Sequence, residues 1–250
     1  MATSAATVNR REPGARRHLW SASREVALAA LAGVAAAVLL ERVVVHEDAF
    51  VWRAAALVVA GGAVLAWLAA RKLAAATFGA ANRVTLVRGV LTLLCAALIG
   101  APPRAAIGWT IVALATLAAL LDAVDGRLAR RRGAASAFGA RFDMETDALL
   151  ILILALLAWQ LGKAGVWIVL AGALRYLFVA AGRALPWLES ALPPSRRRQA
   201  ACVIQIVSLI VCAAPSFVPP VSGAVALAGL VLLAGSFALD VAWLARHARA

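Results

Sequence analysis

Residues 105–127 are AAIGWTIVALATLAALLDAVDGR, an apolar run that ends with two aspartates, a glycine and an arginine. A spanning helix needs about 20 mostly apolar residues, so this run predicts a transmembrane helix. The rest of the chain contains similar runs, and none has the alternating pattern of a strand. They lie at about 26–45, 51–70, 84–101, 138–160, 164–183, 199–216 and 221–244. The sequence therefore predicts an all-α polytopic membrane protein with about eight transmembrane helices.

The composition supports a membrane protein. Hydrophobic residues make up 64% of the 250 residues, and the mean hydropathy is +0.90, well above the value of soluble domains. The net charge of +13 would also suit a nucleic-acid-binding protein. However, the cations lie between the apolar runs, where membrane topology and anionic headgroups account for them. We therefore expect membrane lipid, and no nucleic acid, as a partner.

The positions of Lys and Arg predict the orientation. Threading eight helices from a cytoplasmic N-terminus leaves only four of the 25 Lys and Arg residues outside: Arg42, Arg53, Arg104 and Lys163. Such a bias is typical of cytoplasmic loops, so we expect both termini in the cytoplasm and the chain in the cell inner or plasma membrane. This topology places the ends of runs 105–127 and 138–160 that carry aspartates on the cytoplasmic side.

The chain divides into three segments. Residues 1–24 form a basic tail that we expect to be disordered. Residues 25–72 hold two accessory transmembrane helices without motif residues. Residues 73–250 hold six helices and every candidate site residue, so we expect them to form the catalytic membrane domain.

Four aspartates indicate a metal site. Asp122 and Asp125 are three residues apart, and Asp143 and Asp147 are four apart, so each pair shares one face of its helix. Carboxylates are rarely placed in a membrane without a function, and four close together repel one another unless a cation lies among them. Oxygen ligands without His or Cys suit Mg²⁺ or Mn²⁺.

The residues around the aspartates suit a nucleotide. Gly126 and Gly139 would let a nucleotide approach the backbone, and Arg130 can pair with a phosphate oxygen. These parts fit phosphoryl-type transfer, in which a metal neutralises a pyrophosphate and a carboxylate accepts the proton of the attacking hydroxyl. Two alternatives are buried salt bridges with neighbouring arginines, which stabilise weakly, and the ion or proton relay of a membrane transporter or scaffold.

The motif resembles the signature of the CDP-alcohol phosphotransferase (CDP-alcohol phosphatidyltransferase) family. The pattern Asp-x2-Asp-Gly-x2-Ala-Arg-x8-Gly-x3-Asp-x3-Asp is complete over residues 122–147. Upstream, Asn82-x-x-Thr85-x-x-Arg88 is similar to the start of the family's first core helix. The resemblance covers residues 73–250, and it implies a six-helix membrane core to which residues 25–72 add two helices.

The resemblance also implies an activity. The family moves a substituted phosphate from a CDP-linked donor, usually CDP-diacylglycerol, to a small polar alcohol in phospholipid biosynthesis, and it releases CMP. It implies a homodimer with a cytoplasmic active site and two divalent ions. Asp122, Asp125 and Asp143 match its metal ligands, and Asp147 matches a ligand that is also the general base. The positions that match its donor-binding residues are Gly126, Ala129, Arg130, Gly139, Asn82, Thr85 and Arg88.

The acceptor alcohol is predicted from cations. Family members with a phosphorylated acceptor resemble one another in holding its phosphate with basic residues. The candidates here are Arg175, Arg183, Arg196 and Arg198. An arginine within a membrane run indicates function, although snorkelling to the cytoplasmic face is the alternative. The run 195–198 is loosely similar to a basic segment of phosphatidylglycerophosphate synthases. We therefore expect glycerol 3-phosphate, with inositol phosphate, serine or a second phospholipid as alternatives.

Overall fold

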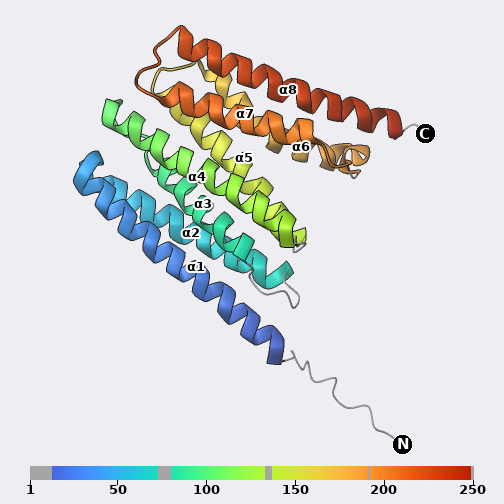
Figure 1. The fold of residues 1–250 in the computed structure, drawn as a ribbon, viewed down its shortest axis with the longest axis horizontal. Coiled ribbons are helices and arrows are strands. Elements are labelled where there is room, and N and C mark those ends of the chain that lie inside the picture. Colours follow the sequence, from blue (N-terminus) through green and yellow to red (C-terminus); the bar gives the residue numbers. More distant parts are fainter. Residues whose placement is uncertain (1–12, 73–79, 133–136, 191, 249–250) are drawn as a thin grey trace, which may run out of the picture.

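The fold of the chain is all-helical. The computed structural model describes residues 13–72, 80–132, 137–190 and 192–248, and these contain no strand. Each α-helix coincides with one predicted run (Figure 1). The helices are α1 (Pro13–Leu40), α2 (Asp48–Lys72), α3 (Ala80–Ala97), α4 (Ala105–Arg132), α5 (Ala137–Gln160), α6 (Val169–Ala184), α7 (Arg196–Ala213) and α8 (Val221–His247). Shorter turns are η1 (Glu41–Val45), η2 (Val166–Ile168) and η3 (Pro186–Glu189).

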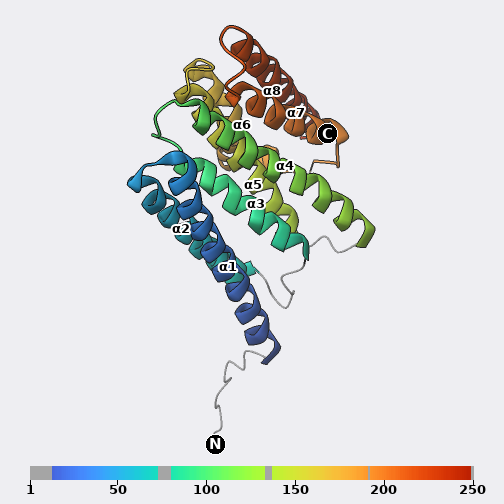
Figure 2. The same cartoon turned by 60° about the vertical axis from the view of Figure 1, so that its left-hand side comes forward.

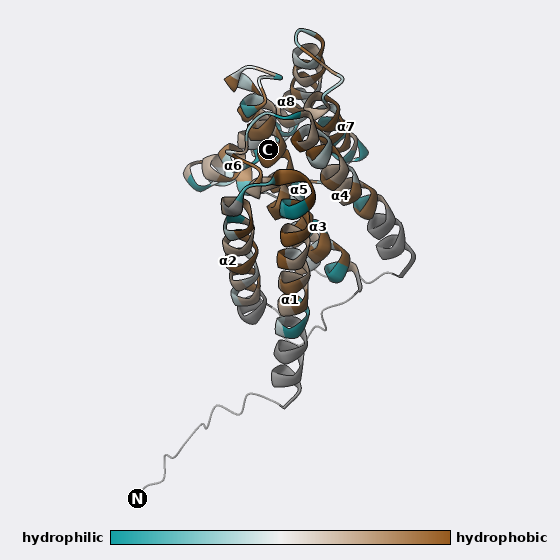
Figure 3. Cartoon of the chain, turned by 90° about the vertical axis from the view of Figure 1, so that its left-hand side faces the viewer, coloured by the Kyte–Doolittle hydropathy of each residue, from teal (hydrophilic) through white to brown (hydrophobic). Residues whose placement is uncertain are grey.

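The helices have the apolar character of a polytopic membrane protein, which confirms the predicted fold class. Within the described residues, α1, α2, α4, α6 and α8 contain stretches long and apolar enough to cross a membrane. Brown, hydrophobic residues recur along α1 and α2 among paler ones (Figure 3). The other three, α3, α5 and α7, carry charged side chains such as Arg88, Asp143 and Arg198.

Helix α1 begins before the predicted apolar run. Helix α1 begins at Pro13, so the second half of the segment 1–24 is helical, while residues 1–12 lie outside the described part. Proline suits the first turn of a helix because its missing N–H would have no partner there. The alanines, arginines and leucine that follow are good helix formers, so the apolar run extends backwards as a polar helix.

The helix order places α3 and α5 at the centre. Helices α1 and α2 form a hairpin that packs on α3, and α3 also contacts α4 and α5 (Figures 1 and 2). Helix α5 in turn contacts α6 and α7, and α7 pairs with α8. The shared core includes Leu94, Ile111, Leu154 and Leu209, which are fully buried. Side chains on the inner faces of α3 and α5 are therefore enclosed by the bundle.

Polar contacts join the accessory helices to the core at one end of the bundle. Arg53 of α2 donates a hydrogen bond to the Ile99 carbonyl after α3 (2.6 Å) and pairs with Glu47 (3.2 Å). Arg104 donates to the Val45 carbonyl of η1 (2.7 Å). These contacts link the α1–α2 connection to the α3–α4 connection, and they lie at the end opposite the aspartates.

A glycine sets the spacing of α5 and α6. A Cβ atom placed on Gly172 would lie 2.3 Å from the Leu152 Cα atom, far inside van der Waals contact. The obstructing atom belongs to the backbone of α5 and cannot rotate away. The two helices can approach this closely only because position 172 has no side chain.

Candidate active site

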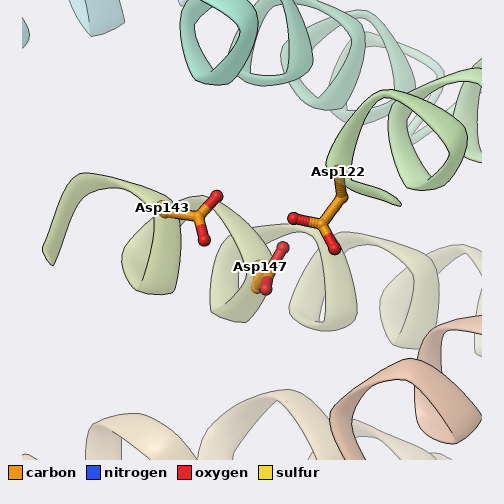
Figure 4. Close-up of side chains that lie close together, drawn as sticks. All are labelled: Asp122, Asp143 and Asp147. Carbon is orange, nitrogen blue, oxygen red and sulfur yellow. The ribbon is translucent and has the colours of Figure 1, made fainter. Parts of the chain in front are cut away.

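Three predicted carboxylates meet where α4 and α5 approach each other. Asp122 lies about three turns before the end of α4. Asp143 and Asp147 lie on successive early turns of α5 (Figure 4). An oxygen of each lies within 4.8 Å of an oxygen of the others, and all three side chains are partly buried. The spacing of four on α5 places its two aspartates on one face, as the sequence predicts.

Part of the motif lies outside the described side chains. The last turns of α4 contain Asp125, Gly126, Ala129 and Arg130, whose side chains lie outside the described part of the structure. Gly139 lies in the first turn of α5, one turn before Asp143.

Arg88 extends from α3 into the carboxylate cluster. Its Nη1 atom lies 2.9 Å from an Asp122 oxygen and also contacts Asp143, and its Nη2 atom contacts Asp147. The side chain is almost completely buried, with 1% of the residue exposed. The structure thus places a residue that was predicted to bind the donor directly among the predicted metal ligands.

The other predicted residues of α3 share the face of Arg88. Asn82 and Thr85 are buried, and their spacing of three aligns them with Arg88 along the helix. The Thr85 hydroxyl donates to the Ala81 carbonyl (3.2 Å), which satisfies it within the helix. All three predicted residues of this helix are therefore buried in the protein interior.

The three carboxylates are suitable ligands for a divalent cation. The guanidinium of Arg88 brings one positive charge to three carboxylates. Oxygen-only ligands close to one another match the preference of Mg²⁺ and Mn²⁺. The cluster could therefore hold a metal ion through Asp122, Asp143 and Asp147.

A cavity of about 570 Å³ opens beside the carboxylates. Its walls come from α5, α6, α7, α8 and the segment before α7, and Asp143 and Asp147 line it. Apolar side chains such as Ile151, Phe178 and Phe237 share the lining with polar ones. The cavity can therefore receive a molecule that has both a polar and an apolar part.

The four predicted acceptor arginines differ in their position relative to the cavity. Arg175 and Arg198 line the cavity, whereas Arg183 and Arg196 are not among its described lining residues. Arg175 donates a hydrogen bond to Glu145 (2.7 Å). Two of the four cations are thus placed on the same cavity as the carboxylates.

Sequence reasoning missed the acidic partners of these arginines. Asp240 of α8 is buried, lines the cavity and accepts a hydrogen bond from Arg197, and it lies 3.6 Å from Arg198. Arg197 also donates to the Ser236 carbonyl (2.6 Å). Asp240 is the one acidic residue after Glu189 in the sequence. A lone acid within an apolar run is the signal that could have identified it.

Comparison with known proteins identifies the family. The family model for CDP-alcohol phosphatidyltransferase matches residues 78–235, from the start of α3 into α8. Comparisons with curated proteins and with solved structures give no match. The family consists of transferases that move a phosphatidyl group from a CDP-alcohol to an alcohol in a membrane and that use a divalent metal. Because the match covers more than half of the chain, including the three clustered aspartates, this protein belongs to the CDP-alcohol phosphatidyltransferase family.

Proposed function

We propose that this transferase moves the phosphatidyl group of CDP-diacylglycerol to glycerol 3-phosphate and releases CMP. One observation supports this acceptor above all. Arg175 and Arg198 line the same cavity as Asp143 and Asp147, so a site for an anionic group lies beside the predicted reaction centre. A phosphorylated alcohol has such a group, and guanidinium groups bind phosphate in charge-assisted pairs.

The proposed donor site combines the metal ligands with the residues of α3 and α4. Asp122, Asp125, Asp143 and Asp147 would hold two Mg²⁺ or Mn²⁺ ions. When bound, such ions neutralise the charge on the pyrophosphate and on the departing CMP. The residues proposed to bind the cytidine diphosphate are Gly126, Ala129, Arg130, Gly139, Asn82, Thr85 and Arg88.

Asp147 is the proposed general base. Its side chain lines the cavity and is 21% exposed, against 41% for Asp143, so it is the more enclosed of the two. In the proposed step the acceptor hydroxyl gives its proton to Asp147, and its oxygen bonds to the phosphorus that carries the lipid. The bond between this phosphorus and the bridging oxygen of CMP breaks, and the electron pair leaves with CMP.

Arg175 is the better placed of the two acceptor arginines. Glu145 occupies its Nη2 atom, whereas its Nε atom is buried with no hydrogen-bond partner among the described residues. A buried donor without a partner is costly, so a bound phosphate oxygen would stabilise it. Inositol phosphate could use the same two cations, and it is the second candidate acceptor.

The proposal extends to orientation and assembly. The excess of Lys and Arg on one side supports a cytoplasmic active site with both termini in the cytoplasm. The start of α1 and the end of α8 lie at the same end of the bundle in Figure 1, as this topology requires. We also propose a homodimer, which rests on the family alone, and a catalytic unit formed by residues 73–250.

The first test measures CMP release from CDP-diacylglycerol by the purified protein with Mg²⁺. The acceptor panel contains glycerol 3-phosphate, inositol phosphate, inositol and serine. We expect release only with glycerol 3-phosphate. Release only with inositol phosphate would keep the phosphate site and change the product. Release with serine or inositol would contradict the role of the two arginines, and a protein that binds no CDP would support the transporter or scaffold alternative.

A pair of variants tests the acceptor site itself. Arg198→Ala should raise the KM for the acceptor about tenfold or more, because a charge-assisted pair to the phosphate is lost. The KM for CDP-diacylglycerol should stay unchanged. Arg183→Ala is the matched control, since Arg183 is not among the described lining residues. Equal behaviour of the two variants would contradict the assignment of Arg198.

A further inference from the structure

We propose that Arg88 is a resident counter-ion of the carboxylate cluster, which holds the metal-free site together and competes with the divalent cation for the same oxygens. This inference rests on the proposed metal site and deepens it. It gives Arg88 a role toward the metal ligands that differs from contact with the CDP donor.

The geometry shows that the guanidinium bridges both helices of the cluster. Its Nη1 atom contacts Asp122 of α4 and Asp143 of α5, and its Nη2 atom contacts Asp147. An arginine from α3 thereby links α4 to two turns of α5. A single phosphate contact would not need a side chain that reaches all three aspartates at once.

Because Arg88 is buried, its guanidinium and the three carboxylates stabilise one another. Arg88 is 1% exposed, and an isolated charge at such a position would be strongly destabilising. The three carboxylates would also repel one another without a cation. Among the described arginines at the adjoining cavity, Arg175 contacts Glu145 and Arg197 contacts Asp240. The metal-free protein is therefore stabilised when Arg88 stays among the aspartates.

The same arrangement opposes metal binding. The three carboxylates that could hold a metal are also those that the guanidinium contacts. An incoming divalent ion must share these groups with a positive charge a few ångströms away, or displace it. Arg88 thus lowers the affinity for the ion and keeps the site organised whenever the ion is absent.

The test measures Mn²⁺ binding and thermal unfolding of the full-length protein purified in detergent, without any substrate. The variants are Arg88→Gln, which removes the charge, and Arg88→Lys, which keeps it. The matched control is Arg83→Gln, because Arg83 lies on the same helix and pairs with Glu25 at 2.8 Å, away from the cluster. Mn²⁺ binding is followed by the paramagnetic resonance signal of the free ion.

Removal of the Arg88 charge should raise the affinity for Mn²⁺ and lower the stability of the metal-free protein. Arg88→Gln should bind Mn²⁺ about tenfold or more tightly, because a repelling charge is gone. In EDTA the same variant should unfold at a clearly lower temperature than wild type, and Mn²⁺ should restore it. Arg88→Lys should lie between Arg88→Gln and wild type in both measurements, and Arg83→Gln should match wild type in Mn²⁺ affinity.

The outcomes that would overturn the inference can be told apart from a failure of the proposed metal site. Wild type that binds Mn²⁺ while Arg88→Gln binds it no more tightly would refute the competition and leave the metal site intact. Wild type that binds no Mn²⁺ would refute the metal site as well. If Arg88→Gln fails to fold, Arg88→Gln combined with Asp122→Asn should recover a folded protein in EDTA, since one carboxylate is removed with the guanidinium. No recovery would also overturn the inference.

Discussion

At the scale of single residues, the aspartates have separable roles. Asp143→Ala should lower CMP release about a hundredfold or more, because a ligand and its charge are lost from the cluster. Asp122→Ala and Asp125→Ala should act alike. CMP release per inserted protein is the measurement, with insertion checked by thermal unfolding in detergent. Near-normal turnover in any of the three variants would contradict the metal assignment.

Asp147→Asn should separate binding from chemistry. The amide keeps the shape of the side chain but cannot accept the acceptor's proton, so turnover should fall about 10²–10⁴-fold. Binding of CDP, measured calorimetrically with Mg²⁺, should remain within a few-fold of wild type. Loss of CDP binding would show that Asp147 acts chiefly as a metal ligand.

Asp240 should control the wall of the acceptor cavity. Asp240→Asn weakens the pairs with Arg197 and Arg198, so the free energy of unfolding should fall by about 1–3 kcal/mol. Because Arg198 lines the cavity, the KM for the acceptor should also rise, while the KM for the donor stays constant. Glu41→Gln, on η1 far from the site, is the control. Equal acceptor KM values would limit Asp240 to a structural role.

The candidate residues show what a sequence can reveal about a site. Aspartates at helical spacing predict that Asp143 and Asp147 share a face, because that relation is local to one helix. The contact of Arg88 with both α4 and α5 depends on how three helices pack, and spacing within α3 carries no information about it. Glu145 lies between Asp143 and Asp147 but off their shared face, and it accepts a hydrogen bond from Arg175 of α6, which the spacing within α5 does not predict.

At the scale of helices, the contact between α5 and α6 supports the cavity. Gly172→Ala places a methyl group against the α5 backbone, so α6 must move. Overpacking of this kind costs about 1–3 kcal/mol, and the cavity between these helices should deform with it. We expect a lower unfolding temperature and reduced CMP release. Gly235→Ala on α8 is the control, because a Cβ there would meet nothing within 4 Å.

Hydropathy predicts the helices better than it predicts their ends. Every long apolar run corresponds to a helix, because a membrane-spanning backbone must satisfy its own hydrogen bonds. The start of α1 differs, since polar helix formers can extend a helix beyond the apolar run without any hydropathy signal. The order in which the helices pack was likewise not predictable, because the apolar surfaces of the runs are alike.

At the scale of the whole molecule, the accessory helices should stabilise the core without performing chemistry. A chain of residues 73–250 should insert, bind Mn²⁺ and release CMP, because the family match begins at residue 78. Its unfolding temperature should be lower, because Arg83 loses Glu25 and the Ile99 carbonyl loses Arg53. Lipid can replace the lost apolar contacts at little cost. A truncated chain that folds but binds no Mn²⁺ would contradict this division.

The buried charge of Arg88 in α3 has a consequence for biosynthesis. A charged residue at the centre of a helix opposes transfer from the translocon into lipid by about 2.5–3.5 kcal/mol. Arg88 leaves the ribosome before Asp122, Asp143 and Asp147, the groups that neutralise it. Insertion of α3 into the bilayer therefore becomes fully favourable only after α4 and α5 have been synthesised. The strongly apolar α1 and α2 are synthesised first and insert into the membrane. Helix α3 can then pack against them before α4 and α5 emerge.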